Sequence, residues 1–226
     1  MEQTLSGFAT WLNTVFAGFD AAAADFAYAL HGSACGTFFD WFFPAVTILG
    51  NSGIFFILVA LAALLFRRSR KAGASILVAL IFGLLLTNLL LKNTVARPRP
   101  YADELSIFFS YWQEIGHGLE NEVFSFPSGH ATAAFGAMTA VFWCGNKKYS
   151  WSAFLLALLI GFSRVYIYVH YASDILGGML IGLLAGTAAY LLVSWLFRKW
   201  ERSENRAAAF VTNASIVTVF RKNTDS

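Results

Sequence analysis

Five long runs of apolar residues constrain the fold of this 226-residue chain more than any other feature. The runs lie at about residues 51–66, 74–91, 129–145, 151–169 and 174–197. An α-helix rises ~1.5 Å per residue, so runs of about 16–24 residues cross most or all of a hydrocarbon core ~30 Å thick. Because lipid offers no hydrogen-bond partners to the backbone, we expect each run to be a transmembrane helix.

The overall composition agrees with a membrane protein. Apolar residues make up 58% of the chain and charged residues only 13%, against roughly 25% charged residues in soluble domains. This composition excludes disordered, collagen-like and disulfide-stapled classes. The formal net charge of +3 is too small to indicate a nucleic-acid partner.

The first 48 residues allow more than one interpretation. Residues 4–19 are typical of an interfacial amphipathic helix, and residues 20–50 are compatible with one further span or with two half-buried helices. Pro44 is expected to kink any helix that passes through it. Three acidic residues interrupt these apolar runs: Asp20, Asp25 and Asp40. The sequence therefore predicts an all-α polytopic membrane helical bundle with five transmembrane helices, a sixth left open, and interfacial helices at the N-terminus.

The basic residues indicate how the bundle is oriented. Of the 16 Lys and Arg residues, twelve fall in three groups: Arg67, Arg68, Arg70 and Lys71; Lys147 and Lys148; and Arg198, Lys199, Arg202, Arg206, Arg221 and Lys222. These groups lie at alternate ends of the five runs, and the positive-inside rule makes those ends cytoplasmic. The loop 92–128 and the turn 169–174 then lie together on the extracytoplasmic side.

The four remaining basic residues oppose this topology: Lys92, Arg97, Arg99 and Arg164. Such residues can extend to lipid headgroups, but three of these four suit a shared anion site. Lys92, Arg99 and Arg164 would meet at one interface, and the planar guanidinium fork suits a phosphate. Arg97 is interpreted as support for this cradle rather than as a phosphate contact.

Ser128 and Gly129 extend the predicted cradle. They stand at the start of an expected helix, where free backbone N–H groups and the helix dipole favour an anion. The carboxylate cluster that Mg²⁺ or Mn²⁺ needs is missing near these residues. We therefore predict a phosphate site that uses neither a metal ion nor another cofactor.

Two histidines next to the cradle supply candidates for hydrolysis. Asp174 follows His170 by four residues, so it can accept the second ring N–H of that imidazole and stabilise its protonated form. His170 is therefore the candidate nucleophile and His130 the candidate general acid. The alternative for each histidine alone is a packed or hydrogen-bonded residue without a catalytic role.

These residues form three motifs that resemble a known family. Lys92-x6-Arg99-Pro100, Pro127-Ser-Gly-His130 and Ser163-Arg164-x5-His170-x3-Asp174 look like the signature motifs of the type 2 phosphatidate phosphatase superfamily, which also includes chloroperoxidases and glucose-6-phosphatase. The resemblance implies phosphate binding by Lys92, Arg99, Ser128, Gly129 and Arg164. It also implies catalysis by His170, His130 and Asp174.

The resemblance covers about residues 50–197, and it implies an integral-membrane phosphatase domain over residues 1–200 with a short cytoplasmic tail at 201–226. We expect a multi-pass protein of the inner (cytoplasmic) membrane whose active site faces the extracytoplasmic side. Its partners would be the lipid bilayer and a lipid phosphate, with no nucleic acid and no obligate protein partner.

The expected reaction is hydrolysis of a lipid phosphate or diphosphate through a phosphohistidine. Undecaprenyl diphosphate is the first choice of substrate, followed by phosphatidylglycerophosphate and phosphatidate. A lipid phosphotransferase that uses the same histidine remains an alternative, as does a non-catalytic lipid-binding or transport protein.

Three features fall outside the motifs. His31 and His117 are expected at the surface or at the membrane interface. The loop 101–126 is either an interfacial amphipathic segment with its aromatic residues among the headgroups or a lid that shapes access for a lipid tail.

Overall fold

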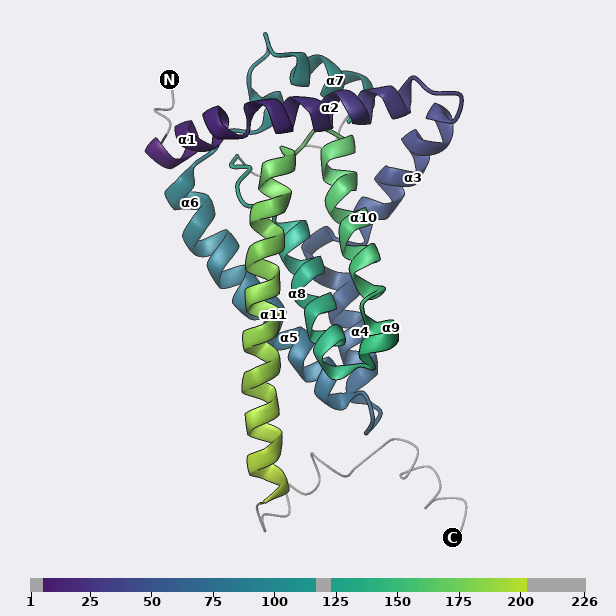
Figure 1. Cartoon of the computed structure of the whole chain (residues 1–226), viewed down its shortest axis with the longest axis vertical. Coiled ribbons are helices and arrows are strands. Elements are labelled where there is room, and N and C mark those ends of the chain that lie inside the picture. The colour runs from purple at the N-terminus through teal and green to yellow at the C-terminus, as the bar shows by residue number, and fades with distance from the viewer. Residues whose placement is uncertain (1–5, 117–122, 203–226) are drawn as a thin grey trace.

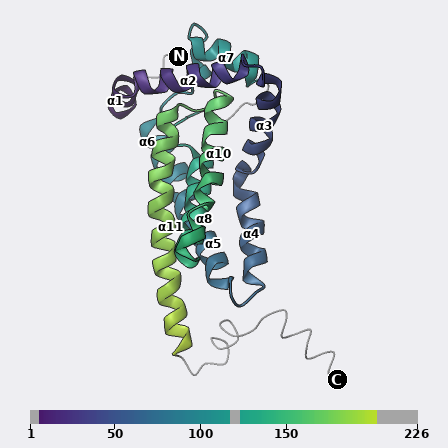
Figure 2. The same cartoon turned by 45° about the vertical axis from the view of Figure 1, so that its right-hand side comes forward.

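The computed structural model describes residues 6–116 and 123–202, and this part of the chain is helical without a strand. The long helices lie side by side, roughly along the long axis of the molecule (Figures 1 and 2). They are α3 (Gly36–Ile48) with α4 (Ile54–Leu64), α5 (Arg70–Leu84) continued by the π-helix η2 (Leu85–Leu91) and α6 (Lys92–Val95), α8 (Gly129–Cys144), α10 (Ala153–Tyr166) and α11 (Ala172–Glu201). The 3₁₀ turn η1 (Asn51–Gly53) joins α3 to α4, and α9 (Lys147–Ser150) follows α8.

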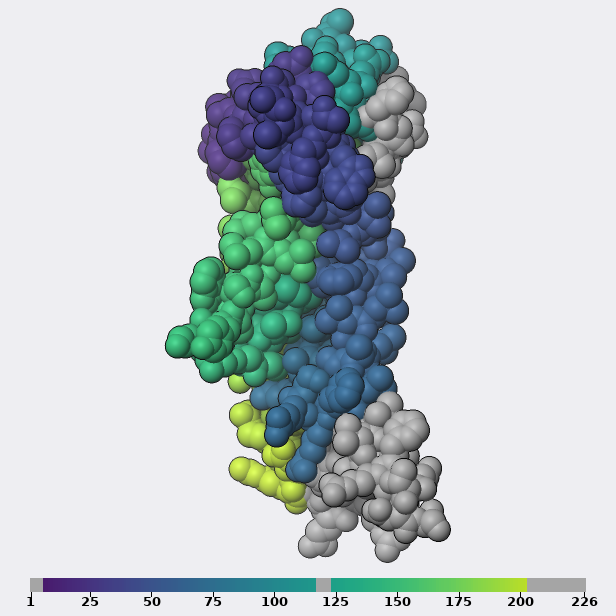
Figure 3. Space-filling view, turned by 90° about the vertical axis from the view of Figure 1, so that its right-hand side faces the viewer, coloured from purple at the N-terminus to yellow at the C-terminus, as the bar shows by residue number. Residues whose placement is uncertain are grey.

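Three further helices lie across one end of this bundle. They are α1 (Gly7–Val15), α2 (Ala17–His31) and α7 (Ile107–Ile115), which follows the 3₁₀ turn η3 (Pro100–Ala102). Figure 1 shows α1 and α2 crossing the ends of α10 and α11, and the space-filling view shows the same end capped by these segments (Figure 3). Residues 6–48 thus contribute two transverse helices and then α3, which runs into the bundle.

The predicted class, an all-α polytopic membrane bundle, is confirmed. Among the described residues, three helical segments are long and apolar enough to span a membrane: 70–95, 147–166 and 172–201. The pair α3 and α4 passes the same test as one broken span with a 45° bend. That bend falls at η1, after the helix has continued through Pro44.

The predicted span 129–145 corresponds to α8, which differs from the other long helices. It has 16 residues, and nine of them are buried by the surrounding helices. Its environment is therefore mainly protein rather than lipid. The total of five spans, and the sixth left open, stay predictions.

Close packing of α8 against α11 holds the centre of the bundle. Gly178, Gly182 and Gly186 follow one face of α11 at intervals of four residues. A Cβ atom at these glycines would lie 2.5–2.6 Å from the carbonyl oxygens of Ser128 and Gly136, or 2.8 Å from that of Thr132, all on or beside α8. The glycines therefore allow the two backbones to approach closely, as small residues do between membrane helices.

His31 joins three of the segments that cap the bundle. Its Nδ1 lies 2.9 Å from Asp40 Oδ1 on α3, and its Nε2 lies 3.3 Å from Glu114 Oε1 on α7. Tyr28 and Tyr166 donate to the same two carboxylates. The predicted interfacial position of His31 thus corresponds to a bridge among α2, α3 and α7, whereas His117 lies outside the described residues.

The His31 bridge predicts a pH-dependent stability. The hydrogen bond to Asp40 raises the pKa of His31 above its ordinary 6.5, so its stabilising contribution is complete below pH 6.5 and is lost as pH rises through the folded-state value. We expect His31→Asn to lower the Tm in detergent by about 1–3 °C at pH 6, and by less at pH 9. A difference that does not change between these pH values would contradict this role.

Candidate active site

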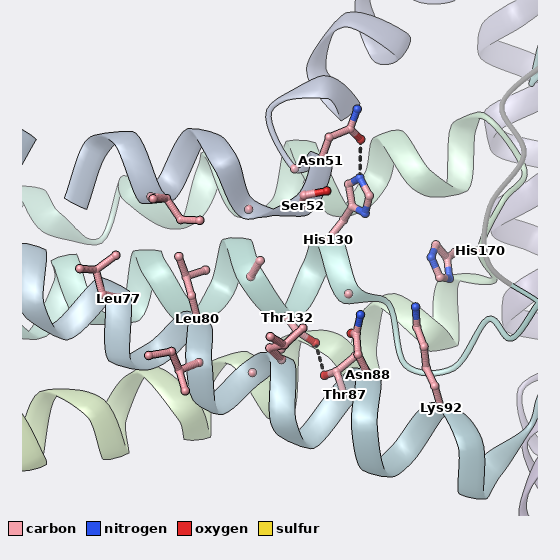
Figure 4. Close-up of a pocket in the computed structure, with 18 of the residues that line it drawn as sticks. Asn51, Ser52, Leu77, Leu80, Thr87, Asn88, Lys92, His130, Thr132 and His170 are labelled. Atoms are coloured by element: carbon pink, nitrogen blue, oxygen red, sulfur yellow. Dashed lines mark hydrogen bonds between the residues drawn. The ribbon is translucent and has the colours of Figure 1, made fainter. Parts of the chain in front are cut away.

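A cavity of about 970 Å³ lies among α4, α5, η2 and α8 (Figure 4). One end of the cavity is lined by polar and charged side chains, among them Asn88, Lys92, Arg99, His130 and His170. The other end is lined by Ile57, Leu77, Leu80, Ile81 and Leu84. The cavity therefore joins a cationic site to an apolar channel.

The structure brings the eight predicted site residues to the polar end of this cavity. Five line it: Lys92, Arg99, Gly129, His130 and His170. Three lie behind its wall and are at most 3% exposed: Ser128, Arg164 and Asp174. The residues come from four parts of the chain: the start of α6, the loop before η3, the start of α8, and the region from the last turn of α10 to the first turn of α11.

Hydrogen bonds determine which nitrogen of His170 carries a proton. Its Nδ1 lies 3.3 Å from Asp174 Oδ2, and its Nε2 lies 2.9 Å from Arg99 Nη1. A guanidinium can only donate and a carboxylate can only accept. The neutral imidazole therefore holds its proton on Nδ1 and keeps a lone pair on Nε2, the nitrogen that faces the phosphate-binding cations.

The surroundings of His170 keep the ring neutral. Burial, followed by the positive charges of Arg99, Arg164 and Lys92, holds the pKa of His170 well below its ordinary 6.5. A neutral imidazole is the nucleophilic form. The cations of the predicted phosphate site therefore also favour the form of His170 that a nucleophile would need.

Backbone and side-chain contacts fix the two arginines of the cradle. Arg99 Nη1 donates to the carbonyl of Val169 at 2.7 Å, and Arg164 Nη1 donates to Thr47 Oγ1 on α3 at 2.9 Å. Both guanidinium groups are 3% exposed. Thr47 was not predicted, because a single threonine within an apolar helix carries no recognisable pattern.

Ser128 caps α8, as the sequence predicts for a residue at a helix start. Its Oγ accepts from Ala131 N, and its own N–H donates to the carbonyl of Asp174 at 3.1 Å. This N–H is therefore already used in a hydrogen bond and does not provide the phosphate contact that the sequence predicts for it. The hydroxyl proton of Ser128 and the backbone of Gly129 are the groups that the start of α8 offers.

His130 rests against the bend between α3 and α4. Its Nε2 lies 2.9 Å from Asn51 Oδ1 (Figure 4). Gly50 leaves the room that the ring needs, because a Cβ there would lie 2.4 Å from His130 Cδ2 and 3.0 Å from Ile160 Cγ2. Neither Gly50 nor Asn51 was predicted, since they follow no motif and lie 79 or more residues before His130 in the sequence.

Arg97 does not face the cavity. It is 1% exposed and forms ion pairs with Asp20 and Asp174. The prediction that it supports the cradle agrees with this placement. From the sequence, Asp20 on α2 is only an interruption of an apolar run. Its contact with Arg97 could not be inferred, because the two residues lie 77 positions apart in the sequence.

The described residues offer little to a metal ion. Residues 6–116 and 123–202 contain no group of three or more His, Cys, Asp or Glu side chains that could hold one. The two carboxylates behind the site, Asp20 and Asp174, both bind Arg97. The hard oxygen ligands that Mg²⁺ prefers are thus few and already paired.

Comparison with known families identifies the fold. The profile of the PAP2 superfamily matches residues 72–198, which is more than half of the chain and includes all three motifs. The chain belongs to the PAP2 superfamily. The resemblance drawn from the motifs is confirmed, and with it the enzyme class, because the relatives below are named as phosphatases of lipid phosphates and diphosphates.

Several characterised PAP2 proteins are similar to this chain. Phosphatidylglycerophosphatase B of Bacillus subtilis is 29% identical over 77% of this chain and 71% of its own length. Undecaprenyl-diphosphatase BcrC of the same species is 32% identical over 57% of this chain and 63% of its own, and lipid A 1-phosphatase of Rhizobium etli is 34% identical over 49% and 45%. The chain thus spans less than two thirds of the last two relatives.

Solved PAP2 structures share the architecture. The transmembrane phosphatidylglycerolphosphate phosphatase of Bacillus subtilis aligns with a TM-score of 0.61 at 25% identity, over 88% of this chain and 93% of that one. Aquifex aeolicus LpxE aligns with a TM-score of 0.59 at 25% identity, over 73% and 92%. The chain is therefore a multi-pass membrane protein of this fold.

The position of His130 can be tested through Gly50. We expect Gly50→Ala to reduce turnover by roughly 10-fold or more, because the new Cβ displaces the ring of a residue whose geometry matters to catalysis. Phosphate release and Tm should be measured together. Gly18→Ala is the matched control, since a Cβ there meets nothing within 4 Å; equal activity of the two variants would contradict the assigned position of His130.

Proposed function

We propose that this chain hydrolyses a lipid phosphate or diphosphate through a phosphohistidine on His170, without a metal ion. The observation that carries the proposal is the cavity, which joins a cationic end with two histidines to an apolar channel. Ile57, Ile81 and Leu84 line that channel and are 38–55% exposed. A lipid can therefore enter sideways, with its tail against these residues and its phosphate at the cations.

The proposed reaction begins with the neutral form of His170 described above, and His130 acts as the general acid. Nε2 of His170 attacks phosphorus, so an N–P bond forms while the bond from phosphorus to the leaving oxygen breaks, and His130 gives that oxygen a proton. Water then attacks phosphorus with His130 as base, the N–P bond breaks and phosphate leaves. Lys92, Arg99, Arg164, Ser128 and Gly129 stabilise the charge on the phosphoryl oxygens.

The proposed location is the inner membrane, with the site on its extracytoplasmic side. The turn between α4 and α5, the short helix α9 and the C-terminal end of α11 lie on the side of the bundle away from α1 and α2 (Figures 1 and 2). These segments contain the basic residues Arg67, Arg68, Lys147, Lys148, Arg198 and Lys199. The positive-inside rule favours that side as the cytoplasmic one. We further propose one phosphatase domain over residues 1–200, a cytoplasmic tail at 201–226, and activity without an obligate protein partner or nucleic acid.

Undecaprenyl diphosphate remains the first proposed substrate, with phosphatidylglycerophosphate and phosphatidate next. Relatives are named for the first two of these lipids, and the relative with 77% coverage of this chain is named for phosphatidylglycerophosphate. The apolar channel accepts any of these tails. A phosphotransferase would use the same phosphohistidine with an acceptor other than water, whereas a lipid-binding protein would need neither histidine.

The first test is phosphate release in detergent from undecaprenyl diphosphate, phosphatidylglycerophosphate and phosphatidate in parallel. We expect turnover of at least one lipid, and His170→Ala should reduce it on the order of 10³-fold or more because the nucleophile is lost. Asp25→Asn, an exposed change on α2, is the control. Absence of release by folded wild-type protein would refute hydrolysis and favour the transferase.

The metal-free mechanism predicts insensitivity to chelation. Phosphate release should be unchanged, within about twofold, after dialysis against EDTA, because cations of the protein itself replace the charge that a metal would supply. The check is the rate before and after dialysis. Loss of most activity, restored by added Mg²⁺, would show this part of the proposal to be wrong.

A further inference from the structure

A buried ion network connects α2 to the aspartate that holds His170. Arg97 Nη2 lies 2.9 Å from Asp20 Oδ2, and Arg97 Nη1 lies 2.7 Å from Asp174 Oδ1. Arg97, Asp20 and Asp174 are 1%, 4% and 0% exposed. The other oxygen of Asp174 faces Nδ1 of His170 at 3.3 Å. Two residues, Arg97 and Asp174, therefore connect Asp20 to the imidazole of His170.

The network also fixes Asp20 to the first turn of α11. Ser173 N donates to Asp20 Oδ1 at 2.8 Å, and Ser173 Oγ donates to Asp20 Oδ2 at 2.7 Å. Arg97 donates to Ser173 Oγ through Nη1 and to Asn13 Oδ1 on α1 through Nε, and its guanidinium lies 3.9 Å from the centre of the Tyr171 ring. Both oxygens of Asp20 are thus held in place.

Counting charges shows what Asp20 adds. Asp174 and Arg97 alone form a neutral pair, so His170 would face no net negative charge on this side. Asp20 gives the group of three a net charge of −1. On its other side His170 faces the cations Arg99, Arg164 and Lys92 together with the imidazole of His130.

This charge matters when His170 reacts. Formation of the N–P bond, like protonation, places a positive charge on the ring, and buried charge is costly unless it is compensated. With Asp20 present, the ring and the network then contain two positive and two negative charges. Without Asp20, one positive charge would be left over beside three further cations.

We propose that Asp20 is a positioning residue for catalysis, which acts through Arg97 to keep Asp174 effectively negative toward His170. A purely structural role explains the network less well, because desolvation offsets most of the attraction within a buried ion pair. The proposal rests on the phosphatase function proposed above. It assigns to the N-terminal segment a part in the chemistry, although that segment precedes the residues matched by the PAP2 profile.

The test compares Asp20→Asn with Asp25→Asn, the same chemical change at an exposed site on the same helix. We expect Asp20→Asn to lower kcat roughly 10–100-fold with KM within about threefold, since the loss concerns the charged intermediate rather than lipid binding. Asp25→Asn should match wild type. Equal kcat in the two variants would overturn the proposal, as would a Tm so reduced that Asp20→Asn no longer folds.

Two further variants separate charge from geometry. Ser173→Ala removes hydrogen bonds from Asp20 and Arg97 but keeps both charges, so kcat should stay within about threefold of wild type. The double variant Asp20→Asn with Arg97→Gln restores a net charge of −1, which then comes from Asp174 alone. Its kcat should be at least about fivefold higher than the kcat of Asp20→Asn. A double variant as slow as Asp20→Asn, or a loss in Ser173→Ala as large, would refute the charge mechanism.

The outcomes distinguish this inference from the function on which it rests. If wild type releases phosphate in a His170-dependent manner and Asp20→Asn equals Asp25→Asn, only the role of Asp20 fails. If folded wild type releases no phosphate from any lipid, the proposed function fails first.

Discussion

The close approach of α8 and α11 is the contact on which the rest of the structure depends. Gly178, Gly182 and Gly186 remove the side chains that would separate the two backbones. The start of α8 then lies against the start of α11, where Ser128 N–H donates to the carbonyl of Asp174. Because one motif opens each of these helices, their packing brings the general acid candidate and the nucleophile candidate to one cavity. Without that approach the motifs would remain separate sequence features.

Compensation of buried charge explains how such a site persists at the edge of a membrane bundle. Lys92 and Arg99 line the cavity, and their positive charge favours an anion there. Behind His170 the balance is reversed, since Asp20 and Asp174 exceed Arg97 by one negative charge. The imidazole thus lies between the cations that line the cavity and a negative group that would stabilise a positive charge on the ring.

Much of the site could be predicted from the sequence, because its residues follow fixed spacings. Lys92, Arg99, His170 and Asp174 were predicted from their motifs, and the structure brings them together. The residues that were not predicted from the sequence are Asp20, Thr47 and Asn51. They reach the site from the N-terminal segments through long-range packing. A lone polar residue in an apolar run has no spacing to reveal it, so only the fold shows which neighbour it meets.

The fold, like the site, could be predicted in part from the sequence. Apolar runs of sufficient length gave the helices and the membrane class, since their length is set by the bilayer. They did not show that α8 would be enclosed by other helices, because a run that is apolar on every side suits either lipid or protein. Nor could they place the bend at Asn51–Gly53, where Ser52 and Gly53 adopt positive φ values of 51° and 67°. The length and hydropathy of an apolar run carry no information on backbone conformations of this kind.

The arrangement also explains why the N-terminal helices belong to the phosphatase rather than to a detachable anchor. α2 supplies Asp20 to the buried network, α3 supplies Thr47 to Arg164, and the turn after α3 supplies Asn51 to His130. Each of these groups meets a charged or titratable residue of a motif. A bundle that began at α4 would remove one of the two carboxylates of Arg97 and the hydroxyl that accepts from Arg164, and the loss of a partner by a buried charged group is costly. The three motifs therefore lie between residues 92 and 174, while much of what positions them lies in the first fifty or so residues.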